Sequence, residues 1–356
     1  FCFCGTFLRH LAPNCRLAMA SLLILSSLFG ATLASQNAVL STQHKEAAEV
    51  LRSKGVVLLD DVAKEDFEKV AMETWQAAGY PDLPLGDYNN MGSVTRPMVG
   101  ANVYDVAAGA PKHLPVSPHS EQAYLFHVPR FAAFMCIKPA EKGGELQLFN
   151  NVRLGSRLGP LMEKFGKLGI TYYRIMGDKV KSSNWSYPTG MWQDRFHTDD
   201  WLEAKKKASE NVAFGGLQGA VLREFEQHLV VMNWTVPAVT FVNTSSTEIS
   251  RAVLQSILDS HHSNNYAANA DGSPAALDST WGDGSQFTME ELQTLKDATK
   301  ESLEVEVLLK SRQVVVIDNW RFAHGRLSYE GARNHAALIS DRFPRAEPPR
   351  FRVSEL

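Results

Sequence analysis

The folds open to this chain are limited chiefly by a short motif whose third partner lies far away in the sequence. Residues 119–121 read His-Ser-Glu, and His324 follows much later in a segment that begins with the apolar run 314–317. Successive side chains of an extended strand point to opposite faces, so we expect His119 and Glu121 to share one face of a strand. A fold that brings His324 to this face gathers two imidazoles and one carboxylate at a single point.

Two imidazoles and one carboxylate are the ligands of non-haem Fe(II) oxygenases, which leave the opposite side of the metal open. The sequence therefore predicts a metal site at His119, Glu121 and His324. The His-x-Glu pair alone has little specificity, because a chain with eleven histidines and many acidic residues produces such pairs in solvated loops by chance. We expect His324 at a strand end, because the apolar run before it has the pattern of a strand buried on both faces.

The segments that follow residues 119–121 and His324 make the pattern more specific. A strand-like run covers residues 129–140, and the turn signal Gly143-Gly144-Glu145 follows it. After the second half come Gly331-Ala332-Arg333 and another apolar run. The remaining segments of this pattern are 192–199, 241–243, 281–285, 318–326 and 336–339.

In the order and spacing of these motifs, the chain resembles the Fe(II)/2-oxoglutarate-dependent dioxygenases of the TauD/TfdA type, and among them the clavaminate synthase-like branch. The resemblance covers most of the chain. It implies a mainly β fold with flanking helices (α+β), namely a double-stranded β-helix or jelly roll whose mouth holds the metal. It also implies that His119, Glu121 and His324 bind Fe(II), and that Arg333 pairs with the far carboxylate of 2-oxoglutarate.

An arginine suits this last role, because its planar guanidinium can donate to both oxygens of a carboxylate. We expect Arg333 on the strand that returns after a turn over residues 328–332, facing the same cavity as His324. Arg326 and Arg342 rank second and third for the role. The alternative interpretation is that Arg333 lies on the surface and forms a salt bridge there.

The chain departs from the family pattern at Leu146, where the common sequence has a threonine whose hydroxyl helps to hold 2-oxoglutarate. The loss of one charge-assisted hydrogen bond costs about 1.5–3 kcal/mol, or one to two powers of ten in affinity. The alternative function is therefore a catalytically degenerate member that acts as a metal-binding scaffold. A zinc hydrolase is a second alternative, but it has no need for a carboxylate-binding Arg333.

The resemblance implies an oxidoreductase that uses O₂ and 2-oxoglutarate to oxidise a substrate C–H bond, with release of succinate and CO₂. Halogenating relatives replace the carboxylate ligand with a small residue, so Glu121 favours hydroxylation or desaturation. The expected partner is a small-molecule substrate that is polar or amino-acid-like. Its identity and the oligomeric state are not determined by the sequence.

Composition is consistent with one catalytic domain over residues 36–356. The 356 residues are 44% hydrophobic, which is enough for a sizeable core, and the net charge of −3 provides no basic surface for nucleic acid. We therefore expect no nucleic-acid partner.

Residues 1–35 are expected to be an N-terminal leader, because arginines precede an apolar stretch that ends in small residues. Its destination is the secretory pathway or an organelle, and no stable membrane insertion is expected after its removal. A membrane anchor is the less favoured alternative, because serines and Gly30 interrupt the stretch. Only Cys136 lies outside the leader region, so no disulfide is expected within the domain. Glycosylation sequons at Asn184, Asn233 and Asn243 would be usable only in the secretory pathway.

Local patterns predict several further elements. A strand is expected at 55–59, and residues 80–118 and 261–285 are expected to be loops. The histidines at 127, 197, 261 and 262 are not expected to be ligands. The expected helices cover residues 46–51, 64–78, 204–211 and 248–259.

Overall fold

The computed structural model describes residues 41–42, 44–87, 98–100, 102–106, 111–182, 190–210, 220–224, 228–237, 240–243, 246–250 and 277–344. The expected leader, the sequon at Asn184 and the pair His261-His262 lie outside these ranges. Within the described residues, no helix is long and apolar enough to cross a membrane.

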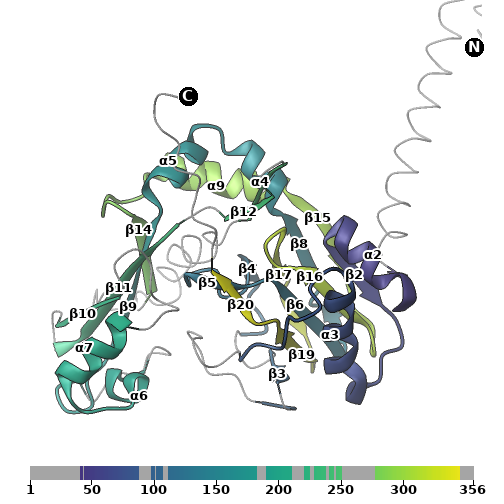
Figure 1. The fold of residues 1–356 in the computed structure, drawn as a ribbon, viewed down its shortest axis with the longest axis horizontal. Helices are drawn as coiled ribbons and strands as arrows, with labels where there is room; N and C mark the ends of the chain where they lie inside the picture. The colour runs from purple at the N-terminus through teal and green to yellow at the C-terminus, as the bar shows by residue number, and fades with distance from the viewer. Residues whose placement is uncertain are drawn as a thin grey trace, which may run out of the picture.

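Two sheets form a jelly roll, which confirms the predicted fold class (Figure 1). The larger sheet has the order β1-β2-β16-β6-β19-β3, with antiparallel pairing everywhere except between β1 and β2. The smaller sheet has the order β15-β8-β17-β4 and is antiparallel throughout. The larger sheet comprises β1 (Ser41–Thr42), β2 (Val56–Leu59), β16 (Val314–Asp318), β6 (Phe131–Lys138), β19 (Asn334–Ile339) and β3 (Tyr104–Asp105). The smaller comprises β15 (Leu303–Val307), β8 (Leu146–Asn150), β17 (Phe322–Arg326) and β4 (Val116–His119).

Side-chain alternation along the strands divides the core of the jelly roll into two layers. Ala337 and Ile339 of β19 face the interior between the two sheets, where they join an apolar cluster with Phe134 and Leu148. We call this region the inter-sheet interior. Leu338, on the opposite face of β19, packs instead under the N-terminal helices.

Those helices are α2 (His44–Lys54) and α3 (Phe67–Ala77), which follows the short 3-10 helix η1 (Lys64–Asp66). Both cover the outer face of the larger sheet, with Trp75 fully buried against it. The helices predicted at 46–51 and 64–78 and the strand predicted at 55–59 are confirmed. Apolar residues at helical spacing face the sheet here, so local pattern and tertiary contact agree.

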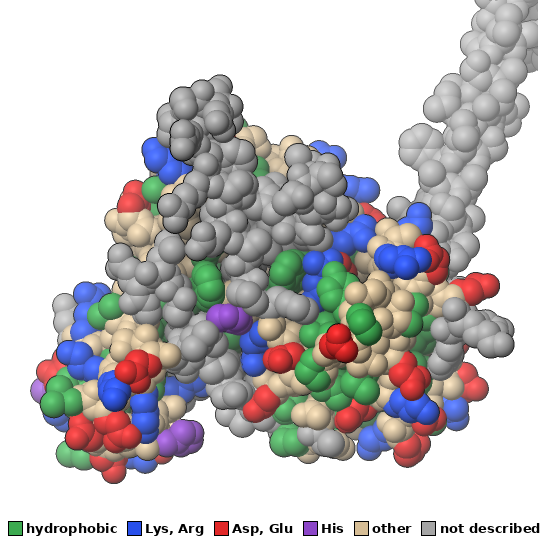
Figure 2. Space-filling view, in the orientation of Figure 1, with side chains coloured by type: hydrophobic (Ala, Val, Ile, Leu, Met, Phe, Trp, Pro, Cys, Tyr) green, Lys and Arg blue, Asp and Glu red, His purple; other side chains and the backbone are tan. Residues whose placement is uncertain are grey.

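A second four-stranded sheet lies beside the jelly roll, with the order β10-β11-β9-β14 (Figure 1). Its strands are β10 (Val221–Glu224), β11 (Val230–Val236), β9 (Ile170–Met176) and β14 (Leu277–Trp281). The helices α4 (Asn151–Arg157), α5 (Pro160–Leu168), α6 (Trp192–Phe196), α7 (Trp201–Glu210) and α9 (Met289–Glu301) surround it. Helix α7 confirms the helix predicted at 204–211. Figure 2 shows a recess between α7 and the jelly roll, with acidic and basic side chains intermixed on both sides.

Two local predictions are wrong over the part of their residues that the structure describes. The predicted helix 248–259 overlaps β13 (Ser246–Ser250), which pairs with β12 (Thr240–Asn243), and its remainder lies outside the described residues. The predicted loop 261–285 includes β14, which pairs with β9. Both strands are short, and pairing outweighs their local propensity: β13 pairs with the neighbouring β12, and β14 pairs with the distant β9.

The remaining strands form two short antiparallel pairs: β7 (Lys142–Gly143) with β18 (Tyr329–Glu330), and β5 (His127–Pro129) with β20 (Arg342–Pro344). Among the described residues of 80–118, the predicted loop is interrupted by β3 and by the start of β4.

Candidate metal centre and co-substrate site

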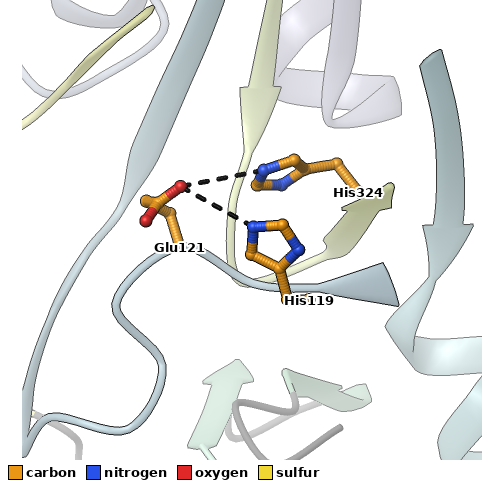
Figure 3. Close-up of side chains that lie close together, drawn as sticks. All are labelled: His119, Glu121 and His324. Carbon is orange, nitrogen blue, oxygen red and sulfur yellow. Dashed lines mark ion pairs between the residues drawn. The ribbon is translucent and has the colours of Figure 1, made fainter. Parts of the chain in front are cut away.

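The structure brings together the three residues of the predicted metal site, but from positions that differ from those expected (Figure 3). Strand β4 ends at His119, so Glu121 lies in the following turn and not on the strand itself. His324 lies in the middle of β17, and not at the end of the apolar strand β16. The chain turns between β16 and β17 and enters the other sheet, where His324 pairs directly with His119.

The side-chain atoms of these residues converge on one point. The Oε2 atom of Glu121 lies 3.9 Å from Nε2 of His119 and 3.8 Å from Nε2 of His324, and all three ligand atoms lie within 4.8 Å of one another. Ligands held at about 2.0–2.2 Å from one ion lie at most about 4.0–4.4 Å apart, so these two pairs are already within the span of a single metal. All three residues are at most 6% exposed, and the buried Oε2 of Glu121 has no hydrogen-bond partner. The donor set therefore fits a divalent metal.

His119 is oriented by a backbone contact. Its Nδ1 lies 2.8 Å from the carbonyl oxygen of Ser117. A carbonyl can only accept, so the proton must reside on Nδ1. The lone pair of Nε2 is thereby directed to the cluster, in the tautomer that a metal needs.

The turn between β16 and β17 holds the carboxylate ligand through Asn319, which is fully buried. Its side-chain oxygen accepts a hydrogen bond from the Glu121 amide at 2.6 Å, and its side-chain nitrogen donates to the carbonyls of Glu121 at 3.1 Å and Pro129 at 2.9 Å. Asn319 therefore fixes the backbone of Glu121 although the two residues are distant in sequence. This role of Asn319 was not predicted, because no local pattern shows which distant residue an asparagine contacts.

Asp318, the neighbour of Asn319, forms a buried ion pair with Arg130. The Nη2 atom of Arg130 lies 2.5 Å from Oδ2 of Asp318, and the guanidinium lies over the ring of Trp320 at 4.8 Å. Burial raises the pKa of Asp318, and the charge of Arg130 opposes this effect without cancelling it. The pair ties the start of β6 to the turn that carries Asn319.

Arg333 lies one residue before β19 and not on it. Its Nη2 donates to Nδ1 of His335 at 2.9 Å, and its guanidinium lies 5.5 Å from the ring of Tyr329. Its Nε is buried and has no hydrogen-bond partner. Burial and the nearby charge of Arg326 lower the pKa of Arg333 to about 10, so the guanidinium stays charged at neutral pH.

The Gly143-Gly144 turn allows the chain to pass close to this arginine. Gly143 has a φ of +69°, and any side chain there would collide with the carbonyl of Ser328. Gly144 has a φ of +81°, and its α-carbon faces Tyr329 and the side chain of Arg333. Both positions thus favour glycine for conformation and for space.

The two other candidate arginines already donate hydrogen bonds to other groups of the protein. Arg326 donates to the carbonyls of Leu327, Pro111 and Leu114. Arg342 donates to the side chain of Gln122 at 2.6 Å and to the carbonyl of Asp87 at 2.6 Å.

Leu146 contributes to the inter-sheet interior and pairs with Arg326 across the smaller sheet. This residue therefore presents an apolar surface where the family pattern has a hydroxyl.

His335 is a partner of Arg333 that sequence analysis missed. It lies two residues after Arg333, so the strand that was expected to include Arg333 would have placed both side chains on one face. Burial, together with the charges of Arg333 and Arg326, lowers its pKa to about 3. The imidazole is therefore neutral at physiological pH and accepts the hydrogen bond from Arg333.

Replacing His335 with glutamine is expected to flatten the pH dependence of stability. In the folded protein His335 stays neutral down to about pH 3, whereas the unfolded chain takes up a proton near pH 6.5. The contribution of His335 to the free energy of unfolding is thus fully present above pH 6.5. It is lost as the pH falls, by about 2 kcal/mol at pH 5. Urea unfolding at pH 7.5 and pH 5 should show this loss in the wild type and a smaller loss in His335→Gln. Equal losses in both proteins would contradict the assignment.

Comparison with known proteins places the chain in a family. The profile of the Taurine catabolism dioxygenase TauD, TfdA family matches residues 22–338, and the chain therefore belongs to this family. Its members are Fe(II)- and 2-oxoglutarate-dependent dioxygenases, so the protein is an oxidoreductase with Fe(II) as cofactor and 2-oxoglutarate and O₂ as co-substrates. A search of curated proteins found no significant match.

Solved structures with a similar fold share little sequence with this chain. The PvcB protein from Pseudomonas aeruginosa is 12% identical, with a TM-score of 0.44 and coverage of 86% of this chain and 83% of its own. A taurine dioxygenase from Burkholderia xenovorans is 14% identical, with a TM-score of 0.42 and coverage of 86% and 88%. An asparagine oxygenase in complex with Fe(II), hydroxyasparagine and succinate is 12% identical, with a TM-score of 0.44 and coverage of 83% and 78%. Similarity at this level carries no information about the substrate or the residue roles.

Proposed function

We propose that the protein hydroxylates a C–H bond of a small polar or amino-acid-like substrate, with His119, Glu121 and His324 as the iron ligands. The observation that carries the proposal is the convergence of these three buried side chains, with the Glu121 oxygen lacking any other partner. The overall reaction would consume the substrate, O₂ and 2-oxoglutarate and would yield the alcohol, succinate and CO₂. When bound, Fe(II) supplies the activation of O₂ for this reaction.

The surrounding residues have distinct tasks in this proposal. His119 is held in the metal-binding tautomer by Ser117, and Glu121 is held by Asn319. The burial of all three ligands keeps bulk water away from the reacting centre. Glu121 also occupies the position that a halogenating enzyme would leave to chloride.

Arg333 is proposed to bind the far carboxylate of 2-oxoglutarate. Of the three candidate arginines, it is the one with a buried donor that lacks an acceptor, and its neutral partner His335 leaves the positive charge uncompensated. Arg326 lies close enough to add to the positive potential, although its guanidinium donates to backbone carbonyls.

Replacing Arg333 with alanine is expected to weaken 2-oxoglutarate binding by at least one to two powers of ten, because a charge-assisted hydrogen bond is lost. The measurement is an anaerobic titration of the Fe(II)-loaded protein with 2-oxoglutarate, followed by the visible charge-transfer band of the chelate. Arg333→Lys should restore only part of the affinity, because an ammonium lacks the planar fork of donors. Arg223→Ala, at an exposed position on β10, is the control.

The alternative function is a metal-binding scaffold that no longer uses 2-oxoglutarate productively. It is motivated by Leu146, whose side chain offers no hydrogen bond. Folded, iron-loaded wild-type protein without a charge-transfer band would support the scaffold and refute the dioxygenase reaction. Substrate-dependent release of succinate would refute the scaffold.

A further inference from the structure

Arg333 is held by an imidazole and not by a carboxylate. Its Nη2 donates to Nδ1 of His335 at 2.9 Å, and no acidic residue in the described part of the chain forms an ion pair with it. The charge of Asp105 acts on Arg333 from a distance, but burial and the charge of Arg326 outweigh it, because the pKa of Arg333 is lowered. The positive charge of Arg333 is therefore left for a ligand.

Arg130 shows how the same protein holds an arginine that has a structural role. Its Nη2 lies 2.5 Å from Oδ2 of Asp318, and both side chains are at most 10% exposed. This carboxylate neutralises the guanidinium, so the pair has no charge left for a ligand. Arg333 is also withdrawn from solvent, since burial is the main cause of its lowered pKa, but its hydrogen-bond partner is an imidazole.

The hydrogen bond itself requires this imidazole to be neutral. A guanidinium has five N–H donors and no acceptor, so Nδ1 of His335 must accept. A protonated imidazole carries N–H groups on both nitrogens and could not accept. His335 is therefore neutral with its proton on Nε2, and burial together with the charges of Arg333 and Arg326 stabilises this state.

Strand β19 fixes the position of His335. The residue is 4% exposed and pairs with Cys136 of β6 across the larger sheet. Cys136 belongs to the inter-sheet interior, as do Ala337 and Ile339, which follow His335 at alternate positions of β19. The imidazole thus lies on a regular, buried strand, whereas Arg333 precedes the strand and depends on side-chain contacts for its direction.

A second cation lies near Arg333 and makes such a contact necessary. The guanidinium of Arg326 lies 4.7 Å from the ring centre of Tyr329, and that of Arg333 lies 5.5 Å from the same ring. Burial and the charge of Arg326 both lower the pKa of Arg333, so the two guanidinium groups repel each other. The hydrogen bond to His335 holds Arg333 in place against this repulsion.

We propose that His335 is a positioning residue for co-substrate binding, which fixes the direction of the Arg333 guanidinium without neutralising its charge. The inference rests on the proposed function, in which Arg333 binds the far carboxylate of 2-oxoglutarate. A carboxylate at position 335 would also hold Arg333, but it would compete with the co-substrate for the charge. An apolar side chain would leave the charge without a fixed direction. The requirement is stricter in this chain because Leu146 donates no hydrogen bond to the co-substrate.

Three variants of nearly equal shape separate direction from charge. His335→Asn places a neutral acceptor near the position of Nδ1, His335→Asp places a charged acceptor there, and His335→Leu places none. All three remove the same part of the imidazole ring, so the comparison among them does not depend on the space that is left. Asn334→Asp is the matched control, because it makes the same change from amide to carboxylate at the exposed neighbouring position.

Each Fe(II)-loaded protein is titrated anaerobically with 2-oxoglutarate and with 2-oxobutanoate, and the dissociation constants are obtained from the charge-transfer band. The two compounds share the 2-oxo acid group, but 2-oxobutanoate lacks the far carboxylate that Arg333 is proposed to bind. Iron content and urea unfolding without any 2-oxo acid show that each variant is loaded and folded. If His335→Asp does not fold, His335→Gln and His335→Glu repeat the comparison with a longer side chain.

His335→Asn is expected to bind 2-oxoglutarate nearly as tightly as the wild type. His335→Asp should bind it about 10–100-fold more weakly than His335→Asn, because its carboxylate takes up charge-assisted hydrogen bonds of Arg333. His335→Leu should lie between the two. The affinity for 2-oxobutanoate should differ little among the three variants, and Asn334→Asp should match the wild type with both compounds.

Equal affinities of His335→Asn and His335→Asp for 2-oxoglutarate would overturn the proposal. An equal loss for both 2-oxo acids would overturn it as well, because His335 would then act on the fold or the metal and not through Arg333. With a charge-transfer band in the wild type, either result refutes this inference alone. A folded, iron-loaded wild type without a band for either compound refutes the proposed function, and this inference with it.

Discussion

Replacing His324 with alanine is expected to abolish Fe(II) binding and 2-oxoglutarate turnover while the fold is retained. The imidazole supplies one of three converging ligand atoms, and its Nε2 lies 3.8 Å from the Glu121 carboxylate. Loss of a residue that merely hydrogen-bonds a metal ligand typically reduces metal affinity roughly 10–100-fold, so loss of the ligand itself should have a larger effect. Iron content after gel filtration and the anaerobic charge-transfer band measure the change.

His228→Asn provides a matched control for this experiment. His228 is exposed and has a φ of +62°, a conformation that asparagine tolerates well. The His228→Asn variant should bind as much iron as the wild type. If His324→Ala also keeps the iron content and turnover of the wild type, the metal lies elsewhere.

Replacing Arg130 with methionine is expected to destabilise the protein by about 3–5 kcal/mol at pH 7.5, because it leaves the buried carboxylate of Asp318 without its counter-ion. Burial already raises the pKa of Asp318, and the loss of Arg130 raises it further. For an acid whose folded pKa is above its unfolded value, stability increases as the pH falls towards the unfolded pKa. The effect of Arg130→Met should therefore be smaller at pH 5 than at pH 7.5.

Urea unfolding at the two pH values tests this prediction. The double variant Arg130→Met/Asp318→Asn should recover much of the stability, because no buried charge remains and the asparagine oxygen still accepts from the Trp320 amide. A double variant as unstable as Arg130→Met would show that packing of the arginine, and not its charge, is responsible.

Sequence patterns succeeded where local periodicity and tertiary burial agree. The helices over α2 and α3 and the strand β16 carry apolar residues at the spacing that their burial requires. The patterns failed at β13 and β14, which are short and are stabilised by strand pairing, β13 with the neighbouring β12 and β14 with the distant β9.

The family, the jelly-roll class and the three candidate ligands could be predicted from residue types and their order along the chain. How the ligands meet depends on tertiary contacts. Glu121 reaches the site from a turn held by Asn319, and His324 reaches it because the chain changes sheets after Asp318. Such contacts join residues far apart in sequence, and side-chain alternation within one strand contains no information about which distant strand it will face.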